Sequence, residues 1–360
     1  MSVDDVLRAL DSVQDPELGR SVVELGMVRD VVDEPGRLGA TIVLTTAGCP
    51  LRGQIRAEAE RALQPLAGDR VVDVRLDVMT KEQRDALGDR LASRNQLVKT
   101  LFGPGSCTRI IAVASGKGGV GKSTVTANLA VALAATGQAV GLIDADIYGP
   151  TIPLMLGLPP EHPVVHDGKL IPPERFGVKV VSIGLFLPQG EPVVWRGPLL
   201  GRAIEQFLGE VSWGSPDYLL IDLPPGTGDV ALTIAQMLPT AEMLIVTTPQ
   251  EAAARTAAKV AKMAAMTGHH ILGVVENMSY FECPSCGKRH YVFGRGGAAA
   301  IAQAAGTEVL ARIPLDEAAR EGGDEGEPPA LHPETAVGAA FAGLAAGILR
   351  LADPAAPAGG

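Results

Sequence analysis

The sequence is poor in aromatic side chains, in cysteine and in long apolar runs. Only 4% of its 360 residues are aromatic, which is too few for the base-stacking surfaces that hold single-stranded nucleic acids. Four cysteines in a chain of this length cannot form a disulfide framework. No uninterrupted apolar run reaches the roughly 18 residues of a membrane-spanning helix. These absences argue against a nucleic-acid-stacking protein, a disulfide-rich secreted domain and an integral membrane protein.

Basic side chains are also scarce relative to acidic ones. The chain has 31 Lys and Arg against 41 Asp and Glu, a formal net charge of −10. A field of this sign repels phosphates and anionic lipids, so we expect neither a nucleic acid nor a membrane as a partner. The N-terminus is acidic and amphipathic and lacks the basic region and apolar block of a signal peptide. With 46% hydrophobic residues for a large core, we predict a soluble, cytoplasmic protein.

The pattern of the chain changes near residue 106, and we predict two domains. Residues 1–80 mix helical and strand-like patterns, which predicts a small α+β domain. Residues 81–105 are charged and end in Gly-Pro-Gly, as in a linker. In residues 106–352 short apolar runs alternate with helical patterns, which predicts a doubly wound α/β domain with a mostly parallel sheet. Residues 353–360 are predicted to be a disordered tail.

The expected elements can be stated by their ranges. In the first domain we expect helices at 4–13 and 51–63 and strands at 27–32, 40–45 and 71–78. In the second we expect strands at 110–114, 140–143, 180–185, 218–222, 243–247, 271–275 and 309–313. The expected helices there are 122–135, 198–211, 230–238, 251–266 and 335–351.

A glycine-rich loop follows the first apolar run of the second domain. It satisfies G-x-x-x-x-G-K-[ST] between a predicted strand and a predicted helix. Glycines let backbone N–H groups converge on phosphate oxygens, and a helix N-terminus adds positive potential. We therefore predict a P-loop that binds ATP, with Lys122 on the β- and γ-phosphates and Ser123 on Mg²⁺. The predicted nucleotide-binding residues of this loop are Gly116, Lys117, Gly118, Gly119, Val120, Gly121, Lys122, Ser123 and Thr124.

Lys117 is a second cation that an ordinary loop of this type does not require. Negative charge develops on the phosphoryl group during its transfer, and a cation beside it acts as an arginine finger does. We predict that Lys117 is catalytic in this way. The alternative is a solvated lysine on a surface loop.

Carboxylates follow two of the predicted strands. Asp144 and Asp146 end one apolar run and Asp222 ends another, and ligands of open α/β sheets bind at the carboxyl ends of strands. We predict that Asp222 holds Mg²⁺, with Asp144 as a second candidate, and that Asp146 or Asp144 positions the attacking water. The alternative for each is a helix-capping Asp in an ordinary turn. The Gly-rich segment 223–229 is suited to sense the γ-phosphate as a switch.

Cys283 and Cys286 form a C-x-x-C motif in a tight turn, and we favour metal or cluster ligation. A tetrahedral Zn²⁺ site or a 4Fe–4S cluster needs four ligands. Cys49 and Cys107 lack a partner at ligand spacing, so the missing pair is most economically supplied by a second copy of the chain. A zinc site completed by His290, or a redox or structural thiol pair, are the alternatives.

Taken together, these motifs resemble the Mrp/ApbC family of iron–sulfur cluster carrier ATPases, which are MinD/ParA-type P-loop ATPases with a deviant Walker A motif. The likeness covers residues 106–351. Besides the loop and the cysteine pair, it is carried by the segments 144–150, 195–198, 222–229 and 276–279. The segments 15–18 and 45–50 resemble the SufT/PaaD-like iron–sulfur assembly domain that is often fused to this family.

The resemblance implies an ATP-hydrolysing homodimer that carries a labile 4Fe–4S cluster between its subunits. Its partners would be cluster scaffold proteins and apo-proteins that receive the cluster. Lys117 would reach across a nucleotide-sandwiched dimer, and Asp146 would orient the hydrolytic water. Asn277 would contact adenine and Pro314 would line the base pocket. The cysteine pairs of the two chains would hold the cluster.

Two other functions fit part of the sequence. A ParA/MinD-like positioning ATPase would need a basic amphipathic anchor at its C-terminus, but Arg350 is the only cation of the last predicted helix. A zinc-stabilised, nucleotide-dependent scaffold would use the C-x-x-C motif structurally, and loss of Cys283 would then unfold it.

Overall fold

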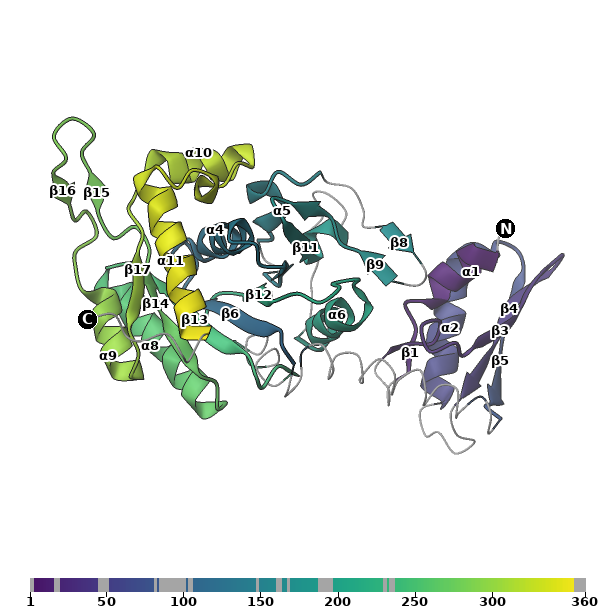
Figure 1. The fold of residues 1–360 in the computed structure, drawn as a ribbon. Helices are drawn as coiled ribbons and strands as arrows, with labels where there is room; N and C mark the ends of the chain where they lie inside the picture. The colour runs from purple at the N-terminus through teal and green to yellow at the C-terminus, as the bar shows by residue number, and fades with distance from the viewer. Residues whose placement is uncertain are drawn as a thin grey trace. The chain divides into compact units, whose positions relative to one another are not determined.

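The computed structural model describes residues 3–15, 20–44, 52–80, 83, 102, 106–146, 149–159, 164–166, 169–186, 197–228, 232 and 237–352. The contacts divide the chain into two compact units, Met1–Asn95 and Gln96–Gly360 (Figure 1). The division falls inside the range 81–105, most of which lies outside the described residues, so the linker stays a prediction. The predicted tail 353–360 also lies outside the described residues.

The small unit packs two helices against a three-stranded sheet of order β3-β4-β5. The first two strands form an antiparallel hairpin, and the helix α2 then leads into β5, which is parallel to β4. The α2 residues Ile55, Ala59 and Leu63 come at helical spacing and are fully buried, which gives the helix its apolar stripe. The elements of this unit are α1 (Val3–Leu10), β1 (Gln14–Asp15), β2 (Arg20–Ser21), β3 (Val28–Glu34), β4 (Arg37–Leu44), α2 (Arg52–Ala67) and β5 (Val71–Val78).

The large unit is built on an eight-stranded sheet of order β10-β11-β7-β12-β6-β13-β14-β17. All neighbouring pairs are parallel except that of the edge strand β10 with β11. Its strands are β6 (Arg109–Ser115), β7 (Val140–Asp144), β10 (Glu174–Arg175), β11 (Val178–Ser182), β12 (Tyr218–Asp222), β13 (Glu242–Thr247), β14 (Ile271–Glu276) and β17 (Val309–Arg312). Short hairpins outside the sheet are formed by β8 (Val164–His166) with β9 (Lys169–Ile171) and by β15 (Phe281–Glu282) with β16 (Arg289–His290).

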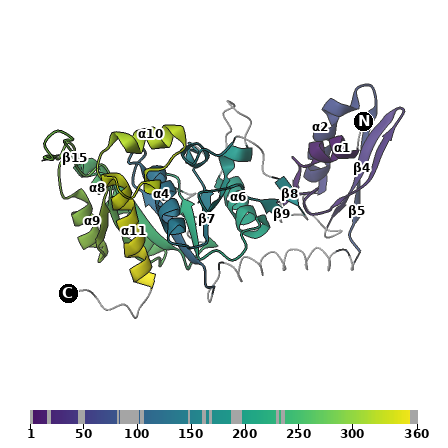
Figure 2. The same ribbon diagram turned by 45° about the horizontal axis from the view of Figure 1, so that its top comes forward.

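Helices cover both faces of this sheet (Figure 2). The helices of the large unit are α4 (Lys122–Ala135), α5 (Ile152–Met155), η1 (Ile183–Phe186), α6 (Gly197–Glu210), α8 (Glu251–Met266), α9 (Gly297–Ala305), α10 (Glu317–Glu325), η2 (Pro329–Leu331) and α11 (Ala336–Ala352). Alternate residues of β6 enter opposite cores: Ile110 packs with the layer of α6, α8 and α9, and Ile111 packs with the layer of α4 and α11. Burial from both sides explains the continuous apolar runs of the central strands.

The helix α4 is buried on nearly all sides, because α11 and η2 pack over it while it packs on β7 and β12. Its sequence is accordingly apolar all round. Since α4 begins at Lys122, this packing fixes the start of the helix at the carboxyl ends of the central strands. Phe102, within the range predicted as linker, is 1% exposed and packs into the core of the large unit.

The predicted α/β class with a mostly parallel sheet is confirmed. The strands 71–78 and 218–222 and the helices 122–135 and 251–266 have the predicted bounds. The range 180–185 is divided between β11 and the 3₁₀ helix η1, and most of 230–238 lies outside the described residues. The short hairpins, α9 and α10 were missed, because two-residue strands and a helix of Ala and Gly carry little periodicity. Among the described residues, no helix is long and apolar enough to cross a membrane.

Candidate functional site

The glycine-rich loop connects β6 to α4 at the carboxyl edge of the sheet. Gly119 and Gly121 have φ angles of 78° and 76°, which glycine adopts without strain. Gly116 has an ordinary φ but no room for a side chain, because a Cβ atom there would lie 2.2 Å from the carbonyl carbon of Thr256 in α8. The backbone shape and the packing of α8 therefore both require glycine in this loop.

Lys122 lies at the centre of a buried group of charges. Its Nζ atom is 2.6 Å from Asp222 Oδ2 and 3.6 Å from Asp146 Oδ2. Ser123 Oγ donates a hydrogen bond to Asp222 Oδ2 at 2.6 Å, and Thr126 Oγ1 donates to Asp222 Oδ1 at 2.7 Å. The side chains of Lys122 and Asp222 are 6% and 0% exposed, so the pair attracts in a medium of low dielectric constant. Thr126 was not predicted as a site residue, although its position one helical turn after Lys122 indicates that it lies on the same face of α4.

Asp144 lies on the strand next to Asp222 and in register with it. Its carboxylate accepts hydrogen bonds from Ser182 Oγ at 3.0 Å and from the backbone N–H groups of Asp146 and Ile152 at 3.2 and 3.3 Å. Burial, together with the charge of Asp222, raises the pKa of Asp144 to about 8. These contacts join the end of β7 to the start of α5.

A cavity of about 260 Å³ lies over the loop. Asp146 lines this cavity and Asp144 does not, which distinguishes the two candidates for positioning the attacking water. Pro225 brings the segment after Asp222 to the same cavity, while Asp229 lies outside the described residues. The lining residues are Ser115, Lys117, Gly118, Gly119, Gly121, Lys122, Ser123, Thr124, Asp146, Thr151, Met155 and Pro225.

Lys117 is not a freely solvated lysine in this structure. Its Nζ atom donates a hydrogen bond to Gln250 Oε1 at 3.4 Å, and Thr248 Oγ1 donates to the same oxygen at 3.2 Å. Gln250 directly precedes α8. The second lysine of the loop is therefore half-buried at the edge of the cavity and held by a residue of its own chain.

Asn277 and Pro314 follow the neighbouring strands β14 and β17, and both are buried. The backbone N–H of Ser279 donates to the carbonyl of Ile313 at 2.8 Å, which joins the two segments. Asn277 Nδ2 donates to the carbonyl of Val120 at 2.9 Å, so this side chain lies against the nucleotide loop. Neither Asn277 nor Pro314 lines the cavity over the loop.

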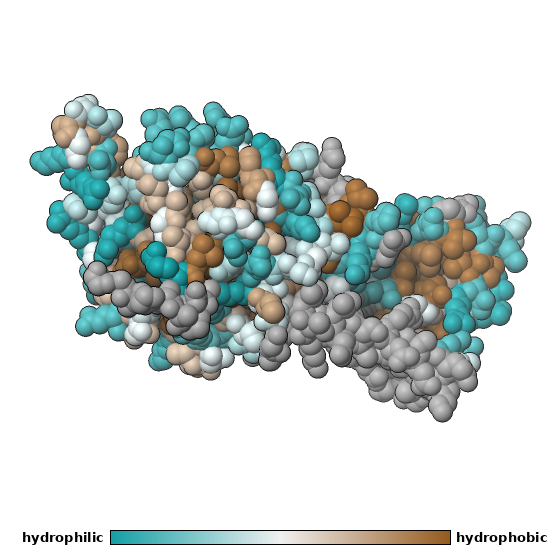
Figure 3. All heavy atoms as spheres, in the orientation of Figure 1, coloured by the Kyte–Doolittle hydropathy of each residue, from teal (hydrophilic) through white to brown (hydrophobic). Residues whose placement is uncertain are grey.

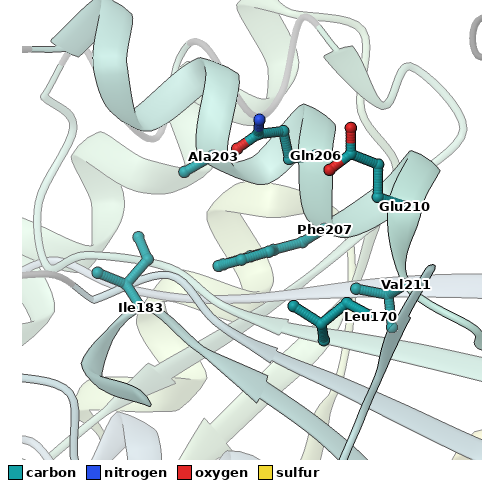
Figure 4. Close-up of a pocket in the computed structure, with 7 residues that line it drawn as sticks. All are labelled: Leu170, Ile183, Ala203, Gln206, Phe207, Glu210 and Val211. Atoms are coloured by element: carbon teal, nitrogen blue, oxygen red, sulfur yellow. The ribbon is translucent and has the colours of Figure 1, made fainter. Parts of the chain in front are cut away.

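A second cavity, of about 210 Å³, lies beneath α6 (Figure 4). Figure 4 shows the ring of Phe207 projecting from α6 toward Ile183, with Gln206 and Glu210 as the polar groups of the lining. This lining offers no cation to a phosphate, so the loop cavity is the better nucleotide site.

The cysteine pair lies in the turn of the β15–β16 hairpin, which projects from the large unit and shows a surface of mixed hydropathy (Figure 3). Cys286 is exposed and Cys283 is half-buried. The backbone N–H of Cys283 donates to the carbonyl of Lys288 at 3.0 Å. Hydrogen bonds from the backbone N–H groups of Ser285 and Cys286 lower the pKa of Cys283, which favours the thiolate that binds metals.

Within the described part of the chain, no group of three or more His, Cys, Asp and Glu side chains is placed to hold a metal ion. His290 is therefore not brought to the cysteine pair as a third ligand, and its ring lies 6.4 Å from that of Phe281. Two thiols complete neither a tetrahedral zinc site nor a cluster site. Cys107 is exposed, and Cys49 lies outside the described residues.

Two family models match the chain, one in each of its compact units. The model of the NUBPL iron-transfer P-loop NTPase family matches residues 106–349, and that of the iron-sulfur cluster assembly protein family matches residues 3–76. The iron-sulfur cluster carrier protein of Mycobacterium leprae is 48% identical over 331 residues, or 90% of this chain and 86% of the relative. That of Synechocystis is 45% identical over 351 residues, or 96% of each chain.

Solved structures show the same fold. A nucleotide-binding protein of Archaeoglobus fulgidus, solved with ADP, is 44% identical, with a TM-score of 0.59 over 66% of this chain and 94% of that one. The cell division ATPase MinD of Pyrococcus furiosus is 29% identical, with a TM-score of 0.52 over 68% of this chain and 99% of its own. The predicted family and fold are thus confirmed, and the chain belongs to the NUBPL iron-transfer P-loop NTPases of the ParA/MinD type.

Proposed function

We propose that this protein is an ATP-hydrolysing carrier that binds an iron–sulfur cluster between two copies of the chain and transfers it to apo-proteins in the cytoplasm. The observation that carries the proposal is the presence, in one unit, of a phosphate-binding loop and of two cysteines on a projecting hairpin, one exposed and one half-buried. The family, and relatives named iron-sulfur cluster carrier proteins, support it.

The loop binds the nucleotide phosphates through its backbone N–H groups and Lys122. In the structure Lys122 is paired with Asp222, so phosphate binding exchanges a carboxylate for phosphate oxygens around the same ammonium group. Ser123 Oγ and Asp222 Oδ2, 2.6 Å apart, present the oxygen ligands that Mg²⁺ prefers. When bound there, Mg²⁺ supplies positive charge to the β- and γ-phosphates. Asp144, whose oxygens already accept three hydrogen bonds, is the weaker candidate for the metal.

Hydrolysis uses Asp146 and Lys117. Asp146 lines the cavity and is the residue that orients the water. Lys117 leaves Gln250 and reaches the nucleotide of the other copy, where it stabilises charge on the phosphoryl group. Asn277 and Pro314 are proposed for the adenine end of the site, because Asn277 contacts the loop and the segment with Pro314 is hydrogen-bonded to the segment with Asn277.

The cluster is the cargo of this protein. A 4Fe–4S cluster takes four thiolates, and each chain supplies Cys283 and Cys286, so a homodimer completes the site. The hairpin places the pair at an exposed position from which a scaffold protein can load it and an apo-protein can receive the cluster.

The test is anaerobic reconstitution with iron and sulfide, comparing the wild type with Cys283→Ala and Cys286→Ala. We expect about four irons and four sulfides per dimer in the wild type and none in the two variants. Cys107→Ala is the matched control, because Cys107 is an exposed thiol outside the hairpin, and it should load normally. Stoichiometric zinc without a reconstitutable cluster would refute the carrier and favour the zinc-stabilised scaffold.

The positioning ATPase is less well supported. In α11, Arg350 is the only basic residue, so this helix lacks the cations that draw an amphipathic anchor to an anionic membrane. Co-sedimentation with anionic liposomes, in the presence and absence of ATP, distinguishes the two functions.

A further inference from the structure

The segment 276–280 runs from β14 into the cysteine hairpin and contacts the nucleotide loop on its way (Figure 1). Asn277, 6% exposed, donates its Nδ2 hydrogen bond to the carbonyl of Val120. The contact is tight, because a Cβ atom on Gly121 would lie 2.2 Å from the same Nδ2 atom. The loop that binds the phosphates therefore rests on a residue that lies just before the hairpin.

The buried carboxylate of Glu276 accepts hydrogen bonds from the segments before and after the hairpin. Glu276, 3% exposed, accepts a hydrogen bond on Oε2 from Ser279 Oγ at 2.6 Å, where the chain enters the hairpin. Its Oε1 atom accepts from the backbone N–H of Ala298 at 3.1 Å, in the first turn of α9, where the chain returns from the hairpin. Negative charge is favoured at this helix N-terminus. Glu276 thus ties the two ends together beside Asn277.

Met278 lies between these two contacts and has a φ angle of 53°. Residues with a Cβ atom adopt this left-handed region at an energetic cost. The conformation is held because Asn277 and Ser279 on either side are buried and hydrogen-bonded. Met278 can therefore leave the left-handed region only if Asn277 or Ser279 breaks its hydrogen bond.

Side chains at the base of the hairpin brace it internally. The guanidinium carbon of Arg289 lies 4.4 Å from the ring centroid of Tyr280, and that of Arg295 lies 3.6 Å from the ring centroid of Tyr291. The two tyrosine rings are 6.4 Å apart. Cation–π and aromatic contacts of this kind stiffen the base, so a displacement of the base carries the cysteine pair with it.

We propose that Glu276 and Ser279 are positioning residues that connect the nucleotide loop to the cysteine hairpin, so that the bound nucleotide sets the geometry of the Cys283–Cys286 pair. Phosphates that draw in the backbone of the loop shift the carbonyl of Val120, and Asn277 follows it. The Glu276 carboxylate then transmits the shift to both ends of the hairpin. This inference rests on the proposed function, because it gives the cluster site its control by ATP.

The test measures thiol alkylation in the reduced, cluster-free full-length protein, with the reacted cysteines resolved by peptide mass spectrometry. Samples contain no nucleotide, Mg²⁺ with ADP, or Mg²⁺ with a non-hydrolysable ATP analogue. We expect the wild-type rate at Cys283 and Cys286 to change about fivefold between these states, the low end of typical coupling between sites. The rate at Cys107 should stay constant and serves as an internal reference.

Ser279→Ala removes one of the two hydrogen bonds that the Glu276 carboxylate accepts, and it changes no residue proposed to bind the nucleotide. We expect its alkylation rates to differ by less than about twofold between nucleotide states, with unchanged ADP affinity. Glu276→Gln, which keeps the shape but loses the charge at α9, should show the same loss. The matched control is Glu282→Gln, which removes the ion pair with Arg289 inside the hairpin and should retain the full nucleotide dependence.

The connection is refuted if the wild-type rates are equal in all three states, or if Ser279→Ala and Glu276→Gln keep the wild-type dependence. Neither result touches the carrier function, which reconstitution of the cluster tests separately. Conversely, a protein that binds no cluster would refute the carrier even if its alkylation rates depend on the nucleotide, because alkylation is measured without a cluster.

Discussion

The nucleotide loop and the cysteine hairpin differ in how much of each site one chain completes. At the loop, Lys122 and Asp222 are buried and joined by a hydrogen bond within one chain. At the hairpin, the thiols are exposed or half-buried, and the described residues place no third metal ligand beside them. The groups proposed to hold the phosphates lie within a single chain, whereas the proposed four-thiolate cluster site draws on a second copy of the chain. This difference agrees with the proposed carrier, in which the nucleotide site stays formed while the cluster is bound and released.

The largest expected effect is on hydrolysis. Lys122→Ala should lose both nucleotide binding and turnover, because it removes the cation at the centre of the loop. Lys117→Ala should lower ATP turnover roughly 10³-fold, as loss of an arginine finger does, while ADP affinity changes little. Steady-state phosphate release and ADP titration measure the two quantities.

A loop that holds the phosphates within one chain should also bind nucleotide without the cysteine pair. Cys283→Ala is therefore the control for both lysine variants, and it should bind ADP as the wild type does. Equal loss of ADP binding in Lys117→Ala and Lys122→Ala would show that the two lysines do not have separate roles.

The next largest effect is on folding, and it separates two glycines of the same loop. Gly116→Ala places a Cβ atom 2.2 Å from the backbone of α8, and we expect a loss of about 3 kcal/mol in unfolding free energy. Gly118→Ala meets no atom within 4 Å and should leave the stability of the nucleotide-free protein unchanged. Urea denaturation followed by tryptophan fluorescence, with Trp213 buried in this unit, compares them. Equal unfolding free energies for the two variants would show that α8 leaves room for a side chain at position 116.

The third effect concerns pH. The carboxyl of Asp144 has a pKa of about 8 in the folded protein and near 3.9 in an unfolded chain. Between these values the folded state keeps a proton that the unfolded state has lost, so the contribution of this group to stability falls as pH rises. Asp144→Asn should flatten the decline of unfolding free energy between pH 5 and 8, by at most about 1.4 kcal/mol per pH unit. A slope identical to that of the wild type would show that Asp144 titrates normally.

The smallest effect is expected at the hairpin. Cys283→Ala should change the unfolding free energy by less than about 1 kcal/mol, because an exposed turn contributes little to the core. A structural zinc site would behave differently, since its loss removes folding free energy. Thermal unfolding of the variant, with zinc measured in the protein as purified, therefore tests how far the two regions differ.

Much of the nucleotide site could be predicted because its signals are local. The loop motif lies within nine consecutive residues, and the strand ends that place Asp144 and Asp222 are marked by apolar runs just before them. The register of β7 with β12 then brings the two carboxylates side by side. Short spacing in the sequence was enough to place these groups on one edge of the sheet.

Contacts between distant segments could not be predicted in the same way. Thr126 reaches Asp222 across 96 positions, and Lys117 reaches Gln250 across 133. Glu276 and Ala298 are separated by a hairpin whose two-residue strands carry no periodicity. Such pairs depend on how the sheet and helices pack, which a single sequence does not specify by spacing.

The two-thiol hairpin has a consequence for how loading of the proposed carrier depends on protein concentration. When each chain brings only half of the ligands, the cluster and the second chain bind by linked equilibria, and each tightens the other by the same factor. Loading then depends on the square of the protein concentration when most chains are single. A modest rise in expression would yield a steep rise in loaded carrier, and dilution would favour discharge. Under the proposed function, the two-thiol hairpin would make the concentration of the protein a control on how much carrier is loaded.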